Sequence, residues 1–224
     1  MVDSSVLRVT NARGAPLPNG FLRQEAGSDT LALLFPGRGY RASMPLLYYT
    51  QLALLERGAD VLRLDLAYDL DPDFGRAAPA ERRAWIRDDA LRAFGAASSQ
   101  RDYPHVVLVG KSLGTWALTD ILQRGDAPAA PRCVWLTPLL NDEALLSAVR
   151  ERRPPSLFVI GTADPFYDAS LLDELGALPG AGRVVVPEAD HGLVVPGNVK
   201  ATLEAMGRYL SALEGFLDAA AAGA

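Results

Sequence analysis

The sequence predicts an α/β fold: a mostly parallel, doubly wound sheet of about six to eight strands with helices on both faces. From residue 30 onward, short apolar runs alternate with helical stretches, which is the pattern of repeated strand–helix units. Most of the runs are apolar at nearly every position, as strands covered on both faces are. The length of 224 residues is suited to a single domain of this class over residues 1–224.

The N-terminal segment precedes this alternation. Two strand-like runs, VLRVTN and GFLRQE, flank the turn-rich stretch ARGAPLPN, so we expect an antiparallel hairpin over residues 5–26 at one edge of the sheet. Six further strands are expected at 30–35, 59–66, 105–110, 132–137, 156–161 and 183–188.

Helical signals lie between these strands. In residues 79–94, Ile86, Ala90 and Phe94 form an apolar stripe, and a proline lies near the first turn. Residues 115–123 are also expected to be helical. The last helix follows Asn198, a good capping residue, and carries apolar residues at three- and four-residue steps. The C-terminal residues 218–224 are expected to fray.

Composition excludes several function classes. The net charge is −5 and the chain has no cluster of basic residues, so we expect no nucleic-acid partner. No apolar run approaches the ~20 residues of a membrane span, and the N-terminus has no secretory h-region, so a cytoplasmic protein is expected. Cys133 lies in the apolar run CVWL and is expected to be a buried thiol. With two histidines and one cysteine, no transition-metal site is expected.

The pentapeptide Gly110–Lys111–Ser112–Leu113–Gly114 lies between the expected strand 105–110 and the expected helix 115–123. A Gly-x-Ser-x-Gly sequence in this setting is typical of a nucleophile elbow, a sharp turn that needs small flanking residues and exposes the serine Oγ. Ser112 is therefore the candidate nucleophile.

A serine hydroxyl needs a base, and the base needs an orienting carboxylate. Asp164 follows the expected strand 156–161, and His191 follows the strand 183–188, so all three residues come at carboxyl ends of strands. Taken singly, Asp164 could be a turn or cap residue and His191 a surface histidine. His105 begins the nucleophile strand, at the opposite end of the sheet from Ser112, and Asp190 is a weaker rival for the acid. Together Ser112, Asp164 and His191 are predicted to form a catalytic triad.

The segment Pro36–Gly37–Arg38–Gly39–Tyr40 follows the strand 30–35. Glycines beside Arg38 let the backbone approach a ligand closely. The backbone amides of Arg38 and Leu113 are predicted to form an oxyanion hole, helped by the dipole of the helix after Leu113. A plain turn is the alternative for this segment.

With these motifs, FPGRG, GKSLG, GTADP and ADHG, residues 30–215 resemble the α/β-hydrolases, in particular small cap-less bacterial members similar to dienelactone hydrolases and short-chain carboxylesterases. The resemblance implies Ser112 as nucleophile, His191 as base and Asp164 as acid. This sequence departs from the family pattern at Pro36, where many members have histidine, and at Lys111, where other side chains are more usual. Residues 138–155 have room for one helix and two short loops, so we expect no cap domain.

An open pocket shaped by loops is therefore expected. Its candidate residues are Gly37, Gly39, Tyr40, Arg41, Lys111 and Tyr68, with residues 68–78 as a wall. Tyr48 and Tyr49 are expected to pack in a helix instead.

The cations Arg38, Arg41 and Lys111 cluster around the predicted site and could recognise an acidic substrate. Salt bridges to Asp65, Asp69 or Asp71 are the interpretation we favour.

The predicted function is hydrolysis of a small carboxylic ester or thioester through a Ser112 acyl-enzyme. This chemistry requires no cofactor, and none is expected. Amide or peptide hydrolysis and perhydrolysis are alternatives on the same fold, and a non-catalytic binding module is an alternative of another class. The sequence does not indicate an oligomeric state.

Overall fold

Eight strands form one sheet in the computed structural model of the chain, which describes residues 1–124 and 131–221. The strand order is β1-β2-β4-β3-β5-β6-β7-β8. β1 and β2 are antiparallel to their neighbours, and the other six strands are parallel. The strands are β1 (Val2–Ser5), β2 (Asn19–Gln24), β3 (Thr30–Phe35), β4 (Asp60–Leu64), β5 (His105–Lys111), β6 (Arg132–Leu136), β7 (Ser156–Gly161) and β8 (Ala181–Val186). The predicted α/β class is confirmed.

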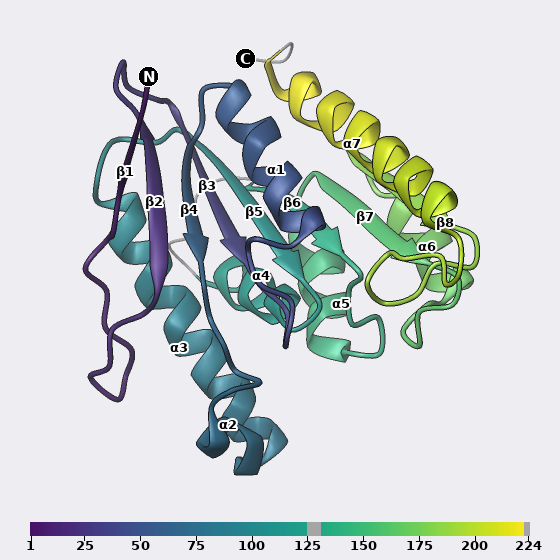
Figure 1. Cartoon of the computed structure of the whole chain (residues 1–224), viewed down its shortest axis with the longest axis horizontal. Helices are drawn as coiled ribbons and strands as arrows, with labels where there is room; N and C mark the ends of the chain where they lie inside the picture. The colour runs from purple at the N-terminus through teal and green to yellow at the C-terminus, as the bar shows by residue number, and fades with distance from the viewer. Residues whose placement is uncertain (125–130, 222–224) are drawn as a thin grey trace.

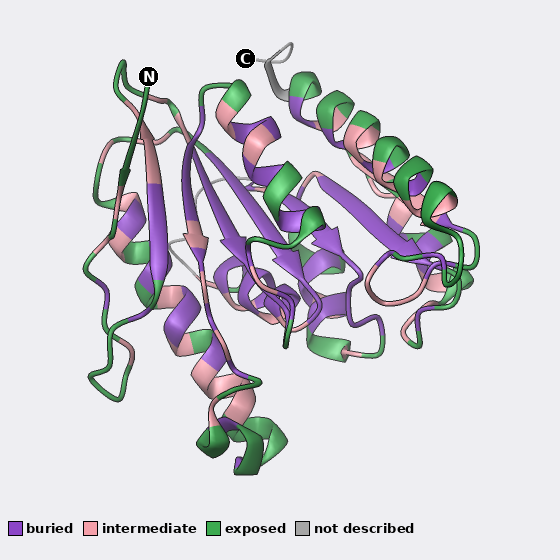
Figure 2. Cartoon of the chain, viewed as in Figure 1, coloured by how far each residue is buried: buried purple, intermediate pink, exposed green. Residues whose placement is uncertain are grey.

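Helices cover both faces of the sheet (Figure 1). α1 (Pro45–Glu56) and α7 (Val199–Ala221) lie on one face, and α3 (Pro79–Ser98), α4 (Gly114–Leu122), α5 (Glu143–Arg152) and α6 (Ala169–Gly176) lie on the other, with the short α2 (Pro72–Arg76) before α3. The central strands are buried almost throughout, whereas β1 is mostly exposed and β8 is mostly half-buried. The outer sides of the helices are exposed (Figure 2).

Successive strand residues belong to different cores. Along β3, Leu31 and Leu33 pack with the α3 side, whereas Ala32 and Leu34 pack with the α1 side. Because both sides of each central strand are covered, alternation of polar and apolar residues is lost and the strands read as continuous apolar runs.

The helix ends follow the local sequence signals. Prolines occupy the first turn of α1, α2 and α3, where the missing N–H costs nothing. The Asn198 Oδ1 accepts a hydrogen bond from the Ala201 amide at 3.0 Å, which agrees with the predicted start of the last helix. That helix continues to Ala221, so part of the segment expected to fray is helical, and residues 222–224 lie outside the described part.

The N-terminal hairpin differs from the prediction in its first strand. β2 coincides with GFLRQE, but its partner is Val2–Ser5 rather than VLRVTN. The Asn19 side chain explains the shift, because its Oδ1 accepts from the Leu7 amide and its Nδ2 donates to the Leu7 carbonyl. These contacts satisfy Leu7 without a strand ladder. Beyond it, Thr10 and Pro16 form an isolated bridge, with backbone hydrogen bonds on either side of it.

The segment after β6 agrees with the expectation of no cap domain. Residues 138–155 contain α5 and two short connections, and α5 packs against the sheet with Leu145 and Val149 fully buried.

Candidate active site

The three residues of the predicted triad lie at one edge of the sheet, because parallel strands bring their carboxyl ends together. Ser112 follows β5, Asp164 follows β7 and His191 follows β8. In Figure 1 the arrowheads of β3, β5 and β6 point toward this same edge.

Ser112 occupies a turn that few side chains tolerate. Its φ is 53°, in the left-handed region, and its amide donates to the Leu136 carbonyl at 2.9 Å. Gly110 and Gly114 make the turn sterically feasible. A Cβ on Gly110 would lie 2.6 Å from the Gly114 carbonyl oxygen, and a Cβ on Gly114 would lie 2.2 Å from that of Phe35. Small residues are therefore required on both sides of the serine.

Hydrogen bonds connect the three side chains in series. The Ser112 Oγ lies 2.8 Å from His191 Nε2, and His191 Nδ1 lies 2.7 Å from Asp164 Oδ2. Asp164 is buried, and its second oxygen accepts from the Phe166 amide at 2.9 Å. The carboxylate thus holds the imidazole with Nε2 directed at the serine, which is the arrangement that lets a neutral histidine accept the serine proton. The imidazole remains about one-third exposed, with a side-chain exposure of 31%.

Two residues shape the loop that carries His191. Asp190 Oδ1 accepts from the amides of Gly192 at 2.7 Å and Val194 at 3.0 Å, so this aspartate stabilises the turn and makes no contact with the imidazole nitrogens. Lys111, only 2% exposed, donates from Nζ to the His191 carbonyl at 2.7 Å. Its ammonium also lies 5.0 Å from the Tyr40 ring centroid.

The electrostatics of Lys111 follow from its burial. Desolvation lowers the pKa of its amine to about 8, and the nearby carboxylates of Asp164 and Asp190 oppose that shift. We expected this lysine in the substrate pocket. Its amine instead connects the turn at Ser112 with the loop that carries His191, from inside the protein.

The segment after β3 lies against Ser112. A Cβ on Gly37 would be 3.1 Å from both the Lys111 carbonyl oxygen and the Ser112 Cβ, so only glycine allows this approach without displacement. Gly39 adopts a φ of 69° in the turn that follows. Within residues 1–124 and 131–221, the amides of Arg38 and Leu113 donate to no other protein group. Leu113 also lies at the N-terminus of α4.

The other two cations near the site, Arg41 and Arg38, differ in their surroundings. Arg41 donates to Asp69 Oδ1 at 2.7 Å and to the Leu66 carbonyl, which agrees with the salt-bridge interpretation. The Arg38 side chain is exposed. Asp65 and Asp71 pair with arginines outside the site, at 3.6 Å and 3.1 Å respectively.

Several tyrosines lie elsewhere than we expected. Tyr68 is buried in the core, stacked on Phe74 at 4.6 Å, and its hydroxyl donates to Asp89, whose pKa burial raises to about 6. Tyr68 therefore packs within the core. Tyr48 and Tyr49, expected to pack in a helix, are 40% and 43% exposed on α1 and contact each other edge to face. Tyr40 is buried, and its hydroxyl accepts from the Leu46 amide.

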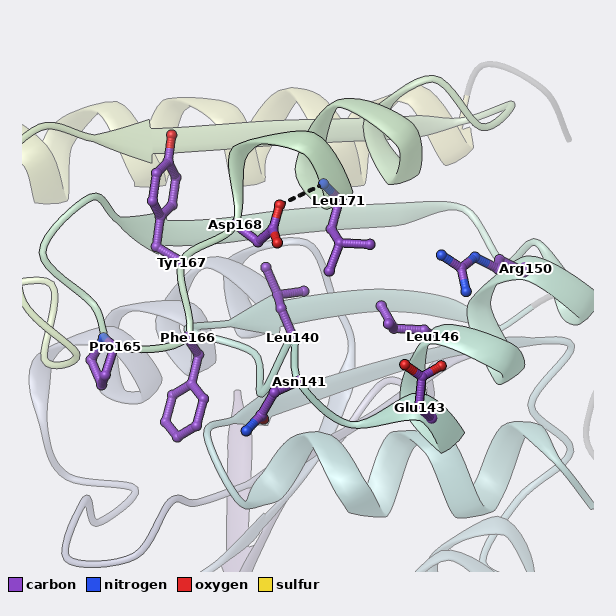
Figure 3. Close-up of a pocket in the computed structure, with 10 residues that line it drawn as sticks. All are labelled: Leu140, Asn141, Glu143, Leu146, Arg150, Pro165, Phe166, Tyr167, Asp168 and Leu171. Carbon is purple, nitrogen blue, oxygen red and sulfur yellow. Dashed lines mark hydrogen bonds between the residues drawn. The ribbon is translucent and has the colours of Figure 1, made fainter.

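Phe166 was not predicted. Its ring lies 5.4 Å from that of His191, and it also lines a cavity of about 440 Å³ between the segments that follow β6 and β7 (Figure 3). Its position two residues after the acid was visible in the sequence, but its contact with His191 depends on how the two loops fold.

The remaining expectations concern groups away from this edge. Cys133 is fully buried, as predicted, and burial raises the pKa of its thiol. His105 begins β5, at the end of the strand opposite Ser112. Within the described residues, no helix is both long and apolar enough to cross a membrane.

Comparisons with known proteins agree with the fold described above. The sequence model of the family described as "Alpha/beta hydrolase domain" matches residues 28–216. No curated protein matches the chain.

Solved structures with this architecture include the dienelactone hydrolase of Anabaena variabilis, at a TM-score of 0.67 and 18% identity, covering 94% of this chain and 96% of that one. A serine hydrolase without lid from Xanthomonas campestris matches at 0.68 and 18%, covering 96% and 94%. An esterase of Pyrococcus furiosus matches at 0.67 and 14%, covering 96% and 92%. At these identities the likeness concerns the fold.

Proposed function

This chain belongs to the alpha/beta hydrolase family, and we propose that it is a serine hydrolase that cleaves small carboxylic esters or thioesters through an acyl-enzyme on Ser112. One observation carries the proposal. Ser112 Oγ, the His191 imidazole and the Asp164 carboxylate form a continuous hydrogen-bonded series with steps of 2.8 and 2.7 Å. Such a series is the means by which a weakly nucleophilic hydroxyl becomes reactive at neutral pH.

The proposed reaction begins when Ser112 attacks the carbonyl carbon and His191 Nε2 takes the hydroxyl proton. The negative charge that develops on the carbonyl oxygen is stabilised by the backbone amides of Arg38 and Leu113. The unengaged state of both amides supports this role, because preorganised donors need no rearrangement when the charge appears.

The tetrahedral intermediate then collapses, and the protonated His191 gives its proton to the departing alcohol or thiol. Water attacks the acyl-enzyme with His191 as base, which releases the carboxylic acid and restores the Ser112 hydroxyl. Asp164 stays ionised throughout and holds the imidazole in the required tautomer. These steps use only groups of the chain and water.

Hydrolysis of short-chain p-nitrophenyl esters tests the proposal, with wild type, Ser112→Ala and Ser211→Ala compared. Ser211 is exposed on α7 and serves as the matched control. We expect turnover in the wild type and in Ser211→Ala, and a loss of roughly 10⁴-fold or more in Ser112→Ala. p-Nitroanilides with the same acyl groups, assayed in parallel, compare amide with ester cleavage. Equal turnover in Ser112→Ala would contradict the proposal.

A further inference from the structure

The cavity beside the triad lies between two loops at the catalytic edge. Its walls come from the segment after β6, one side of α5, and the segment that joins β7 to α6 with the start of α6 (Figure 3). The lining residues are Leu140, Asn141, Glu143, Leu146, Arg150, Pro165, Phe166, Tyr167, Asp168 and Leu171. We propose that this cavity binds the leaving group of the substrate and selects an apolar alcohol, phenol or thiol that carries no negative charge. This inference rests on the proposed function.

Phe166 connects the cavity with the proton-transfer residue. Its ring contacts the His191 ring at 5.4 Å, its amide donates to Asp164, and its side chain forms part of the cavity wall. The leaving-group oxygen must come within hydrogen-bond reach of His191 Nε2 to receive its proton. A substituent on that oxygen therefore lies near the imidazole and can extend past Phe166 into the cavity.

The carbonyl oxygen of the substrate points elsewhere in the same arrangement. Its donors, the amides of Arg38 and Leu113, belong to the segment after β3 and to the start of α4. The cavity belongs to the segments after β6 and β7, which lie beyond β5 in the strand order. The leaving group and the carbonyl oxygen are thus served by different loops.

Part of the cavity wall is apolar, although polar groups supply the larger share of the lining. Leu140 and Leu146 are buried, and Phe166, Tyr167 and Leu171 are half-buried around them. A volume of about 440 Å³ is within the range of small-molecule sites. Because an apolar cavity of roughly 150 Å³ already accommodates benzene, this one has room for an aromatic or branched aliphatic group.

The rim carries an excess of negative charge. Glu143 and Asp168 line the cavity, and the guanidinium of Arg150 binds both carboxylate oxygens of Glu174, at 2.7 and 3.0 Å. That ion pair offsets the one positive charge of the lining, so an anionic leaving group meets repulsion whereas a neutral or cationic one does not.

Leu171→Trp tests the volume of the cavity, with Leu203→Trp on the exposed side of α7 as the matched control. The readout is the ratio of kcat/KM for benzyl acetate to that for methyl acetate. We expect this ratio to fall about tenfold or more in Leu171→Trp and to stay unchanged in the control. Circular dichroism and thermal denaturation establish that each variant is folded, and a constant ratio in folded Leu171→Trp would overturn the subsite.

Glu143→Gln tests the charge of the rim, with the exposed Glu56→Gln on α1, on the other face of the sheet, as the control. Wild type should prefer benzyl acetate to 4-carboxybenzyl acetate, and Glu143→Gln should narrow that preference by about twofold to fivefold. An unaltered preference, or a change confined to esters that vary in the acyl chain, would overturn the assignment. If wild type cleaves none of the esters, the proposed function fails and the subsite fails with it.

Discussion

Lys111 is the residue whose surroundings are least expected from its chemistry. A lysine ammonium is seldom buried without a carboxylate partner, yet this one lies beneath the nucleophile turn with a backbone carbonyl and an aromatic ring as its contacts. The hydrogen bond from Lys111 Nζ to the His191 carbonyl fixes the His191 backbone relative to the turn at Ser112. In our account, a costly buried charge thus positions the base against the nucleophile.

The burial of Lys111 predicts a pH dependence of stability. In the unfolded chain its amine titrates near the ordinary value of 10.5, and in the folded protein at about 8. Between these values the unfolded state binds more protons, so the contribution of Lys111 to the free energy of unfolding becomes more favourable as pH rises, and the full cost of the buried charge is present below pH 8.

Urea denaturation of wild type and Lys111→Met at several pH values measures this contribution. The difference between the two free energies of unfolding should move in favour of wild type by on the order of 2–3 kcal/mol from about pH 8 to about pH 10.5. A difference that stays constant over this range would show that the amine is not desolvated in the folded protein.

Asp164→Asn tests the role of the acid. An asparagine in this position can donate to His191 Nδ1, which would leave the proton on Nε2, where the Ser112 hydroxyl needs an acceptor. We expect kcat for ester hydrolysis to fall roughly 10³- to 10⁴-fold with little change in stability. Asp190→Asn is the matched comparison, because Asp190 serves the loop and makes no contact with the imidazole nitrogens. If kcat falls further in Asp190→Asn than in Asp164→Asn, Asp164 is not the acid.

At the scale of elements, the turn between β5 and α4 depends on close approach of backbones. β5 and α4 meet at Ser112, and the end of β3 passes directly beside Gly114. Any side chain at Gly114 would push α4 away from β3 and move the Leu113 amide with it. The geometry of the serine is therefore a property of three elements packed together.

Gly114→Ala should lower the free energy of unfolding by roughly 2–4 kcal/mol, because its Cβ would lie 2.2 Å from the Phe35 carbonyl oxygen. Gly207→Ala, in the interior of α7 with no atom within 4 Å of the added Cβ, is the control and should stabilise by up to about 1 kcal/mol. Thermal or chemical denaturation of both variants measures the contrast. Equal effects at the two positions would contradict the packing described for the turn.

The elements were predictable where local signals and tertiary packing agree. The central parallel strands are largely apolar on both faces, and Asn198 and the prolines mark helix starts, so local sequence was enough to predict these elements. The first strand was misassigned because the side chain of Asn19, twelve residues from Leu7, replaces a strand ladder there. Sequence periodicity cannot register such a contact.

At the scale of the whole molecule, the two ends of the parallel strands have different roles. We call them the carboxyl edge and the amino edge of the sheet. The carboxyl edge holds the proposed triad of Ser112, Asp164 and His191. The amino edge holds a buried carboxylate, Asp60, that accepts from Arg101 at 3.0 Å, from the Tyr103 hydroxyl at 2.7 Å and from the Gln24 amide at 2.7 Å. These contacts join β2, β4 and the segment before β5, and they stabilise the sheet far from the reacting groups.

Asp60→Asn should therefore lower stability by about 2–4 kcal/mol, because Arg101 loses a buried partner, while kcat and KM of the folded enzyme stay close to wild type. Denaturation and steady-state ester kinetics on the same preparation separate the two effects. A selective loss of kcat without loss of stability would contradict the division between the edges.

The proximity of Ser112, Asp164 and His191 was predictable because each residue comes soon after the end of a strand. A parallel sheet brings these strand ends together. The roles of Lys111, Phe166 and Tyr68 were not predictable. Each depends on which way a side chain turns once neighbouring loops are in place: Lys111 inward to the His191 carbonyl, Phe166 toward the imidazole, and Tyr68 into the core beside Asp89. Strand order locates the site, and the packing of its loops shapes the pocket.

Labelling with a fluorophosphonate probe tests the central claim most directly, with the modified peptide identified by mass spectrometry. The account predicts that wild type and the Ser211→Ala control are labelled on Ser112 alone and that Ser112→Ala is not labelled. If folded wild-type protein stays unlabelled, or if Ser112→Ala is labelled as fast as wild type, Ser112 is not an activated nucleophile and the account is wrong.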